Sequence, residues 1–448
     1  MSKSYVYRVS LLLEQAAVIP IALMFSRYRS FLEPVRVELA PLTIIIGKNG
    51  SGKSVLTRLP LLIASGLSPS ANSVLDLSAG GVSHAARFED LIHQRSAQPF
   101  SLGAEISDGR RSLSFLTTMR YVVERHALGI ESFTLSDQDG LIVSIEASRP
   151  EDIGNTEGLF AVKSRGVEAS STSGVRFVGL FADSIGGNDD LGYRLSEVRK
   201  EFAAAFDSPC YLGPFRSEQG SSARVANQGV RGLGPKGEYA IDLLGADALA
   251  GNGNLGRAVE EWFGRAMTGN SVKLEQIGSF VRMLVHDPIR NIDVDMSETG
   301  AGFAQVFPIA VQALGMQTGA VSTSISIVEQ PELHLHPGAH GELADLIVSS
   351  AARCYARSRY LCETHSEQFI TRVRLGIAQG RIAHTAVRIV SVGHLSERDG
   401  VIEPIRTIEI DAEGNMDAWP VGVFDEAFDD LLRLQSVQRG ERADEGRA

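Results

Sequence analysis

A single stretch decides the fold: Gly47-Lys48-Asn49-Gly50-Ser51-Gly52-Lys53-Ser54. It follows the apolar run 42–46, precedes the run 55–59, and fits the P-loop pattern G-x-x-x-x-G-K-[ST]. The glycines let backbone N–H groups converge on a phosphate, and the helix that follows directs its positive dipole end at the same anion. We expect Lys53 to contact the β- and γ-phosphates and the Ser54 hydroxyl to bind Mg²⁺. The strand, loop and helix together predict a nucleoside triphosphate site.

The bulk composition is that of a soluble globular protein. The chain has 448 residues, 44% hydrophobic and 22% charged, enough for one large domain or two to three ordinary ones. A formal charge of −11 argues against a general polyanion-binding surface. The three cysteines form no C-x-x-C pair, so we expect reduced thiols in a cytoplasmic protein.

The most apolar early stretch, residues 9–25, is interrupted by Glu14, Gln15 and Pro20. It is too short for a confident membrane span, and it lacks the basic region and the cleavage site of a signal peptide. We expect it to form a strand or helix that packs on the domain, with no membrane partner.

Hydrophobic periodicity predicts an α/β fold. A strand pair over 24–39 and the P-loop unit come first, and a β-rich region over 100–181 and a helix over 191–206 follow. The rest is expected as strand 210–212, helices 238–249 and 255–267, strands 272–277, 280–286 and 292–294, helix 304–316, strand 324–328, helix 338–356, strand 359–362, helix 367–379, and strands 386–392 and 402–410. The predicted division is an N-terminal lobe with the P-loop (1–110), an inserted β-rich and helical region (111–270), a C-terminal lobe (271–430) and a polar tail (431–448).

A second apolar strand, 324–328, ends in an acid, Glu329. A P-loop ATPase needs such a strand beside the P-loop strand, with its terminal carboxylate in the magnesium shell. The sequence therefore predicts Mg²⁺ held by Ser54 and Glu329.

The residues after that strand carry a family resemblance. The stretch Gln330-Pro331-Glu332-Leu333-His334-Leu335-His336-Pro337 resembles the extended Walker B and D-loop of ABC-type ATPases of the SMC, RecF and OLD group. It is most similar to the stand-alone ATPases of bacterial anti-phage defence loci. Further matching pieces are Tyr28-Arg29-Ser30-Phe31, Leu212-Gly213-Pro214-Phe215-Arg216, residues 300–308 as the signature loop, Glu363-Thr364-His365-Ser366-Glu367 as the switch-histidine motif, and residues 419–426. The match covers most of 25–430 and is vague from about 110 to 205.

The resemblance implies an ABC-type ATPase head that binds ATP and Mg²⁺, with Arg29 among the nucleotide-binding residues. Two heads of this class sandwich two nucleotides, so the expected assembly is a homodimer or an oligomer of dimers. The signature loop, Gly300, Gly302, Ala304 and Gln305, would then face the γ-phosphate bound by the partner copy, and His365 would sense or position it. A separate effector subunit, such as a nuclease or toxin, is the implied partner.

Two positions depart from the family pattern. Gln330 stands where a glutamate usually polarises the attacking water, and an amide cannot accept that proton. Either Glu332 substitutes, or hydrolysis is slow and the ATP-bound dimer long-lived; the predicted catalytic set is Glu329, Gln330, Glu332 and His365. Ala304 replaces a common serine and removes one donor to the γ-phosphate, so dimerisation would be weaker or supported by other contacts.

Other functions remain as alternatives. A RecF-like DNA-repair clamp shares the catalytic parts, and DNA would then meet a basic surface, although charged runs are more often solvated faces. The candidate basic residues are Arg216, Arg224, Arg231, Lys236, Arg372, Arg374, Arg381 and Arg388. A transporter ATPase and a small-molecule kinase fit the motifs poorly. Two further sites are less favoured than ordinary loop and strand-end structure. One is a metal cluster of His334, His336, His340 and Glu332, and the other is a nuclease centre at Asp293-Val294-Asp295.

Overall fold

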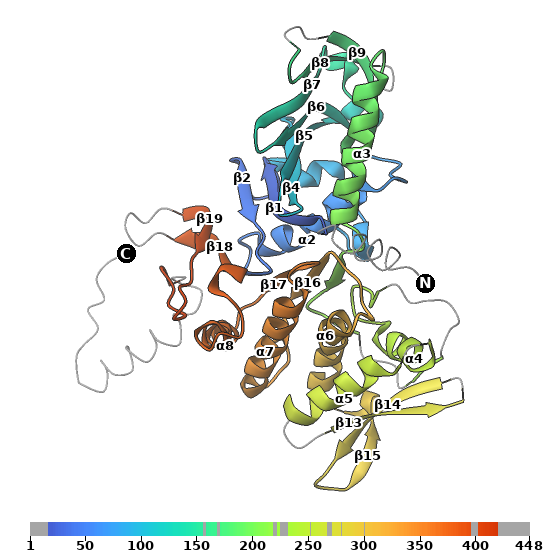
Figure 1. The fold of residues 1–448 in the computed structure, drawn as a ribbon, viewed down its shortest axis with the longest axis vertical. Helices are drawn as coiled ribbons and strands as arrows, with labels where there is room; N and C mark the ends of the chain where they lie inside the picture. Colours follow the sequence, from blue (N-terminus) through green and yellow to red (C-terminus); the bar gives the residue numbers. More distant parts are fainter. Residues whose placement is uncertain are drawn as a thin grey trace, which may run out of the picture.

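A computed structural model describes residues 17–155, 158–167, 171–217, 222–224, 232–250, 252–266, 271–278, 280–299, 301–395 and 402–419. Two lobes meet at a central sheet (Figure 1). The upper lobe is built on a nine-stranded sheet of order β10-β9-β8-β7-β6-β5-β4-β1-β2, in which all neighbours are antiparallel. Its strands are β1 (Ile19–Ser26), β2 (Val35–Glu38), β4 (Phe100–Ser107), β5 (Ser112–Val122), β6 (Ala127–Asp137), β7 (Gly140–Ala147), β8 (Leu159–Ser164), β9 (Ser171–Val178) and β10 (Phe181–Ile185).

The central sheet carries the P-loop strand. Its order is β11-β16-β17-β3-β18-β19, parallel except for the edge strand β19. The strands are β3 (Leu42–Gly47), β11 (Cys210–Leu212), β16 (Ile325–Glu329), β17 (Arg359–Glu363), β18 (Val387–Leu395) and β19 (Ile402–Ile408). β3 is buried along its whole length, as expected of a strand covered on both faces.

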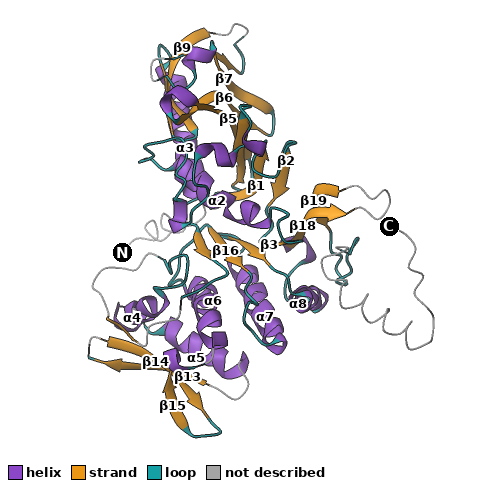
Figure 2. Cartoon of the chain, turned by 180° about the vertical axis from the view of Figure 1, so that it is seen from behind, coloured by secondary structure: helices purple, strands orange, loops and turns teal. Residues whose placement is uncertain are grey.

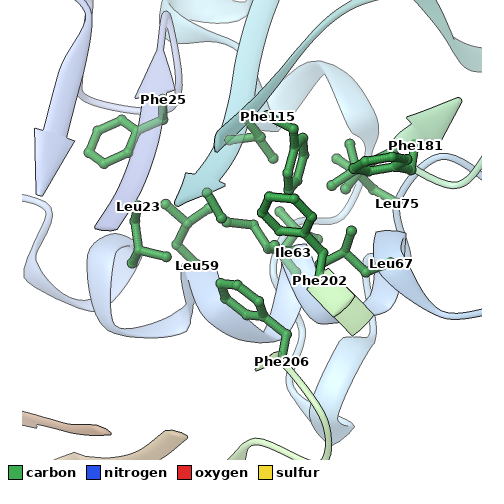
Figure 3. Packing of buried hydrophobic residues seen from close by; sticks show 14 of the residues in the cluster. Leu23, Phe25, Leu59, Ile63, Leu67, Leu75, Phe115, Phe181, Phe202 and Phe206 are labelled. Atoms are coloured by element: carbon green, nitrogen blue, oxygen red, sulfur yellow. The ribbon is translucent and has the colours of Figure 1, made fainter. Parts of the chain in front are cut away.

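Side-chain alternation in β3 divides the interior into two cores. Ile45 packs with the upper lobe, whereas Leu42, Ile44 and Ile46 face the opposite way into the lower core. The upper core holds α2 (Lys53–Leu67) and α3 (Asp189–Ala205); Leu59, Ile63 and Leu67 of α2 meet phenylalanines of the sheet and of α3 (Figure 3).

The lower core is helical. It is formed by α4 (Ala240–Ala250), α5 (Asn254–Ala266), α6 (Ala301–Thr318), α7 (Pro337–Cys354) and α8 (Glu367–Ala378), and α6, α7 and α8 lie beneath the central sheet (Figure 2). A small sheet of β12 (Ser222–Arg224), β13 (Ser271–Ile277), β14 (Phe280–Asp287) and β15 (Ile292–Asp295) lies beside α4 and α5.

The α/β class predicted from the sequence is confirmed, and the expected elements form within a few residues of their predicted ends. The predicted domain limits do not coincide with the two cores. The sheet runs unbroken across residue 110, because β4 and β5 pair as a hairpin. The region 111–270 is divided: β5–β10 and α3 belong to the upper core, and α4 and α5 to the lower one. The tail, 431–448, lies outside the described residues.

Candidate nucleotide-binding site

The loop between β3 and α2 forms an anion cradle. Gly47, Gly50 and Gly52 have φ values of 148°, 78° and 105°, which favour glycine. A Cβ at Gly47 would lie 2.4 Å from the Val392 carbonyl oxygen, and one at Gly52 would lie 2.5 Å from Ser30 Oγ. Both dihedral angle and space therefore exclude side chains here. Gly52, the N-cap of α2, makes no side-chain cap hydrogen bond, and the N–H groups of a helix's first turn are the ones that bind a phosphate.

Lys53 begins α2 and is 5% exposed. Its Nζ donates to the carbonyl oxygens of Gly47 at 2.8 Å and Lys48 at 2.7 Å. Burial lowers the pKa of the ammonium, while the nearby Glu363 carboxylate acts in the opposite direction. Ser51 Oγ in the same loop is buried without a hydrogen-bond partner. A phosphate group would take the lysine from the two carbonyls and offer Ser51 an acceptor.

The strand order corrects one prediction about this site. β17 lies between β3 and β16, so the strand that ends in Glu329 is not beside the P-loop strand. β17 pairs with β3 and ends at Glu363, whose register partner is Ile45. Ser54 Oγ donates to Glu363 Oε2 at 3.1 Å. The carboxylate that accepts from the hydroxyl expected to bind Mg²⁺ is therefore one that the sequence analysis did not select.

Glu329 has other partners. It is 1% exposed, and its Oε1 accepts from Thr57 Oγ1 and from Arg58 Nε, each at 2.8 Å. Its Oε2 accepts from Arg58 Nη2 at 2.8 Å, which completes a bidentate ion pair. The hydrogen bonds to Glu329 raise the pKa of Arg58, and the guanidinium lies 5.7 Å from the ring centroid of Tyr211. Glu329 is thus hydrogen-bonded by two residues of α2, Thr57 and Arg58, which lie one helical turn beyond Ser54.

The electrostatics of Glu363 follow from its position. Burial raises the pKa of its carboxyl to about 7, the Glu329 charge adds to the rise, and Lys53 and Ser54 oppose it. Mg²⁺ usually binds proteins through one or two carboxylates together with phosphate oxygens and waters. The Ser54 hydroxyl with an adjacent buried carboxylate fits that donor set. Within the described ranges, no group of three or more His, Cys, Asp and Glu side chains is placed to hold a metal.

Glu332 and His365 lie together beyond the strand ends. Glu332 Oε1 accepts from the His365 backbone N–H at 2.6 Å, and burial raises the pKa of the Glu332 carboxyl. Glu332 Oε2 and His365 Nε2 are both buried, with no hydrogen-bond partner among the described residues. Burial lowers the pKa of His365, and Lys53 adds to the effect. Gln330, in a left-handed conformation with φ 45°, donates its backbone N–H to the Glu363 carbonyl at 2.7 Å. The strand ends thus bring the three residues next to Glu363.

Three of the other candidate acids and histidines, His336, His340 and Asp293, have structural partners. His336 caps α7 by accepting from the Gly338 N–H at 3.1 Å, and His340 Nδ1 lies 2.8 Å from Ser366 Oγ. Asp293 Oδ1 lies 2.8 Å from His286 Nδ1 in the small sheet.

The predicted signature loop begins α6. Gly300 lies outside the described residues, and Gly302 is close enough to the D-loop that a Cβ would lie 3.7 Å from the His334 carbonyl oxygen. Ala304 and Gln305 are each 8% exposed. The Gln305 amide accepts from the Arg216 N–H at 3.3 Å and donates to the Arg216 carbonyl at 3.1 Å. A contact with a γ-phosphate across a dimer would require this amide to leave both bonds.

Arg216 is a residue whose role the sequence analysis missed. It is 5% exposed and donates through Nη2 to the carbonyl oxygens of Glu329 at 2.7 Å and Gln330 at 3.3 Å. Burial lowers its pKa to about 10. Its assignment to a DNA-facing surface is wrong, because the guanidinium is enclosed between β16 and α6. The position of Arg216 shortly after the Gly213-Pro214 break was the sequence feature that could have indicated this buried role.

The other candidate basic residues are largely paired within the protein. Arg372 and Arg381 pair with Asp345 at 3.4 Å and 2.6 Å, and Arg388 pairs with Glu38. Arg374 donates to the Gly414 carbonyl at 2.7 Å. Arg231 and residues 420–426 of the C-terminal element lie outside the described residues.

Arg29 lines a cavity of about 480 Å³ that adjoins the P-loop. Gly50 and Gly52 line the same cavity, and Asp90 contributes a carboxylate. Arg29 has a φ of 55°, and its guanidinium donates to the His84 carbonyl oxygen. The structure therefore brings Arg29 beside the glycine loop, and its nucleotide-binding role stays a prediction.

Comparisons with known proteins complete the description. Residues 386–434 match the family described as "Protein of unknown function (DUF3696)". Comparison with curated proteins gives no match. Among solved structures, the chain is similar to an Smc head bound to the C-winged helix domain of ScpA (14% identity, 87% of this chain and 98% of that chain, TM-score 0.44). It is also similar to an Smc head with an extended coiled coil bound to the C-terminal domain of ScpA from Pyrococcus furiosus (14%, 93% and 100%, 0.44) and to the SMC head domain from Thermotoga maritima (10%, 88% and 99%, 0.41). Likenesses of this size do not assign a function.

In the part of the chain that the structure describes, no helix combines the length and the apolar character that a bilayer span requires.

Proposed function

We propose that this chain is an ABC-type ATPase that binds ATP with Mg²⁺, dimerises head to head on ATP, and gates a partner effector in bacterial anti-phage defence. The observation that carries the nucleotide site is the glycine cradle at the start of α2, with a buried Lys53 that donates to two carbonyls of its own loop. A cation in that position exchanges backbone acceptors for phosphate oxygens at little cost in geometry.

The chemistry proposed for the site is slow hydrolysis. The amide of Gln330 orients water without taking its proton. Glu332 is the candidate substitute, because burial raises its pKa towards the range useful to a general base. Within the described part of the chain its Oε2 makes no hydrogen bond within the usual distance, so it is available to accept one from water. ATP binding would then outlast hydrolysis, and the protein would act as an ATP-gated clamp.

The dimer and the effector rest on the motifs of the signature loop, the D-loop and the switch histidine. The resemblance places a partner copy opposite the P-loop, and a nuclease or toxin as a separate subunit. The RecF-like alternative receives less support, because Arg216 is buried and Arg372, Arg381 and Arg388 are neutralised by carboxylates.

ATP titration with calorimetry and light scattering tests the proposal. We expect the wild type to bind ATP and to double its mass, and Lys53→Met to do neither. Steady-state turnover well above about 1 s⁻¹, a typical lower value for enzymes, would contradict the clamp. Glu332→Gln is expected to remove residual turnover and to leave ATP binding intact. Co-purification with a nuclease or toxin would support the effector role, whereas a preference for DNA ends or gaps would favour repair.

A further inference from the structure

Two buried glutamates end neighbouring parallel strands beside the P-loop. Glu329 of β16 and Glu363 of β17 are register partners, 1% and 2% exposed. Two carboxylates this close repel each other in a low-dielectric interior unless cations compensate them. The protein supplies one such cation to each: Arg58 to Glu329 and, at longer range, Lys53 to Glu363.

The partners of the two carboxylates differ in kind. Glu329 receives three hydrogen bonds at 2.8 Å, two of them from one guanidinium fork. Moving it to a metal would break a bidentate ion pair at a buried site. Among the residues that the structure describes, the one side-chain donor to Glu363 is the Ser54 hydroxyl, at 3.1 Å to Oε2 and 3.5 Å to Oε1. A single neutral donor leaves most of the lone pairs of Glu363 free for a metal.

We propose that Glu363, and not Glu329, is the carboxylate that binds the nucleotide's Mg²⁺ together with Ser54. The inference rests on the proposed function and names the metal ligands of that site. Adjacent ligands of an octahedral Mg²⁺ with bonds of 2.0–2.1 Å lie about 2.9 Å apart. The observed separation between Ser54 Oγ and Glu363 Oε2, 3.1 Å, is already close to that value. Glu329 is then a positioning residue, which fixes α2 against β16 through Arg58.

The test measures how strongly Mg²⁺ tightens nucleotide binding. The affinity of the wild type for a fluorescent ATP analogue is compared in Mg²⁺ and in EDTA. We expect Glu363→Gln to reduce the ratio of the two dissociation constants at least tenfold, with the affinity in EDTA little changed. Glu329→Gln is the matched control, since it removes one charge from the neighbouring strand end and should keep the ratio. Mn²⁺ binding to each variant with the analogue, followed by electron paramagnetic resonance, gives a readout that does not need turnover.

The outcomes distinguish a failure of the Glu363 assignment from a failure of the proposed function. The assignment is overturned if Glu329→Gln loses the Mg²⁺ effect, alone or together with Glu363→Gln, or if Glu363→Gln keeps it. A wild type that binds no nucleotide refutes the proposed function and the assignment with it. Thermal unfolding checks that each variant is folded. If Glu363→Gln is not, Glu363→Asp retains the charge but withdraws the carboxylate by one methylene, and an unchanged Mg²⁺ effect in that variant would also contradict the assignment.

Discussion

The ion pair between Arg58 and Glu329 allows a quantitative prediction. Arg58→Met keeps an unbranched apolar stem but removes the guanidinium. Glu329, 1% exposed, would lose its cation and keep only neutral neighbours among the described residues, the Thr57 hydroxyl and Tyr211. Removing one partner of a buried pair costs about 3–5 kcal/mol. Because the Arg58 side chain is 30% exposed, water can reach the vacated space, so we expect the low end, about 3 kcal/mol.

A double-mutant cycle in urea denaturation measures this value. Arg58→Met, Glu329→Gln and the double variant should give a coupling energy of about 2 kcal/mol, with the double variant more stable than Arg58→Met. Arg36→Met is the matched control, because Arg36 pairs with Glu38 and Glu105 at a surface where its side chain is 44% exposed. That change should cost no more than about 1 kcal/mol. A loss below about 1 kcal/mol for Arg58→Met, or a coupling energy near zero, would refute the view that Arg58 holds Glu329 in place.

Three further predictions concern the same site. Glu363 has a folded pKa of about 7 against an ordinary value of 4.5, so the wild type without nucleotide should lose stability as the pH rises from 4.5 to 7, by about 3 kcal/mol. Glu363→Gln should flatten that dependence in chemical denaturation at a series of pH values, and a parallel loss in both proteins would contradict it. Arg216→Met leaves the Glu329 and Gln330 carbonyls without their donor, so a loss of about 3 kcal/mol is expected in the same assay, and a change below about 0.5 kcal/mol would argue against the role of Arg216. Lys53→Met should weaken ATP binding at least tenfold, since a hydrogen bond to a charged group contributes about 1.5–3 kcal/mol. The variant also leaves the Gly47 and Lys48 carbonyls without their donor, so its unfolding free energy is measured beside its affinity. Unchanged affinity would place the phosphates elsewhere.

Local patterns were sufficient to predict the elements of the site. The apolar run before Gly47 becomes β3, and the pattern around Lys53 becomes the start of α2, because burial, glycine dihedrals and helix initiation are decided within a few residues. The same holds for the helix predicted over 338–356, observed as α7 with His336 as its cap.

Local sequence patterns could not predict the order of the strands in the central sheet. The apolar run 359–362 ends in Glu363 much as 324–328 ends in Glu329, and the sequence does not say which strand joins β3. Strand pairing is decided by contacts between residues hundreds of positions apart, and both acids satisfy the same motif. The burial of Arg216 and its exchange of hydrogen bonds with Gln305 have the same origin, since β11 and α6 meet only in the folded protein.

The contacts around Glu329 link the proposed nucleotide site to α6, the helix that begins at the predicted signature loop. Its side chain is held by Arg58 on α2, and its carbonyl oxygen is held by Arg216, whose backbone pairs with Gln305 on α6. This chain of contacts connects the helix that starts at the P-loop with the helix that would meet a second copy. A contiguous chain does not by itself establish coupling, which requires an element that changes state when nucleotide binds. If the nucleotide binds as proposed, the P-loop supplies a candidate, because Lys53 would exchange two carbonyls for phosphate, and Glu363 would exchange the Ser54 hydroxyl for a metal that both then share. Glu329 and Arg216 need not change partners in that step. A displacement of α2 would therefore move Glu329 and Arg216 with it, and through them α6.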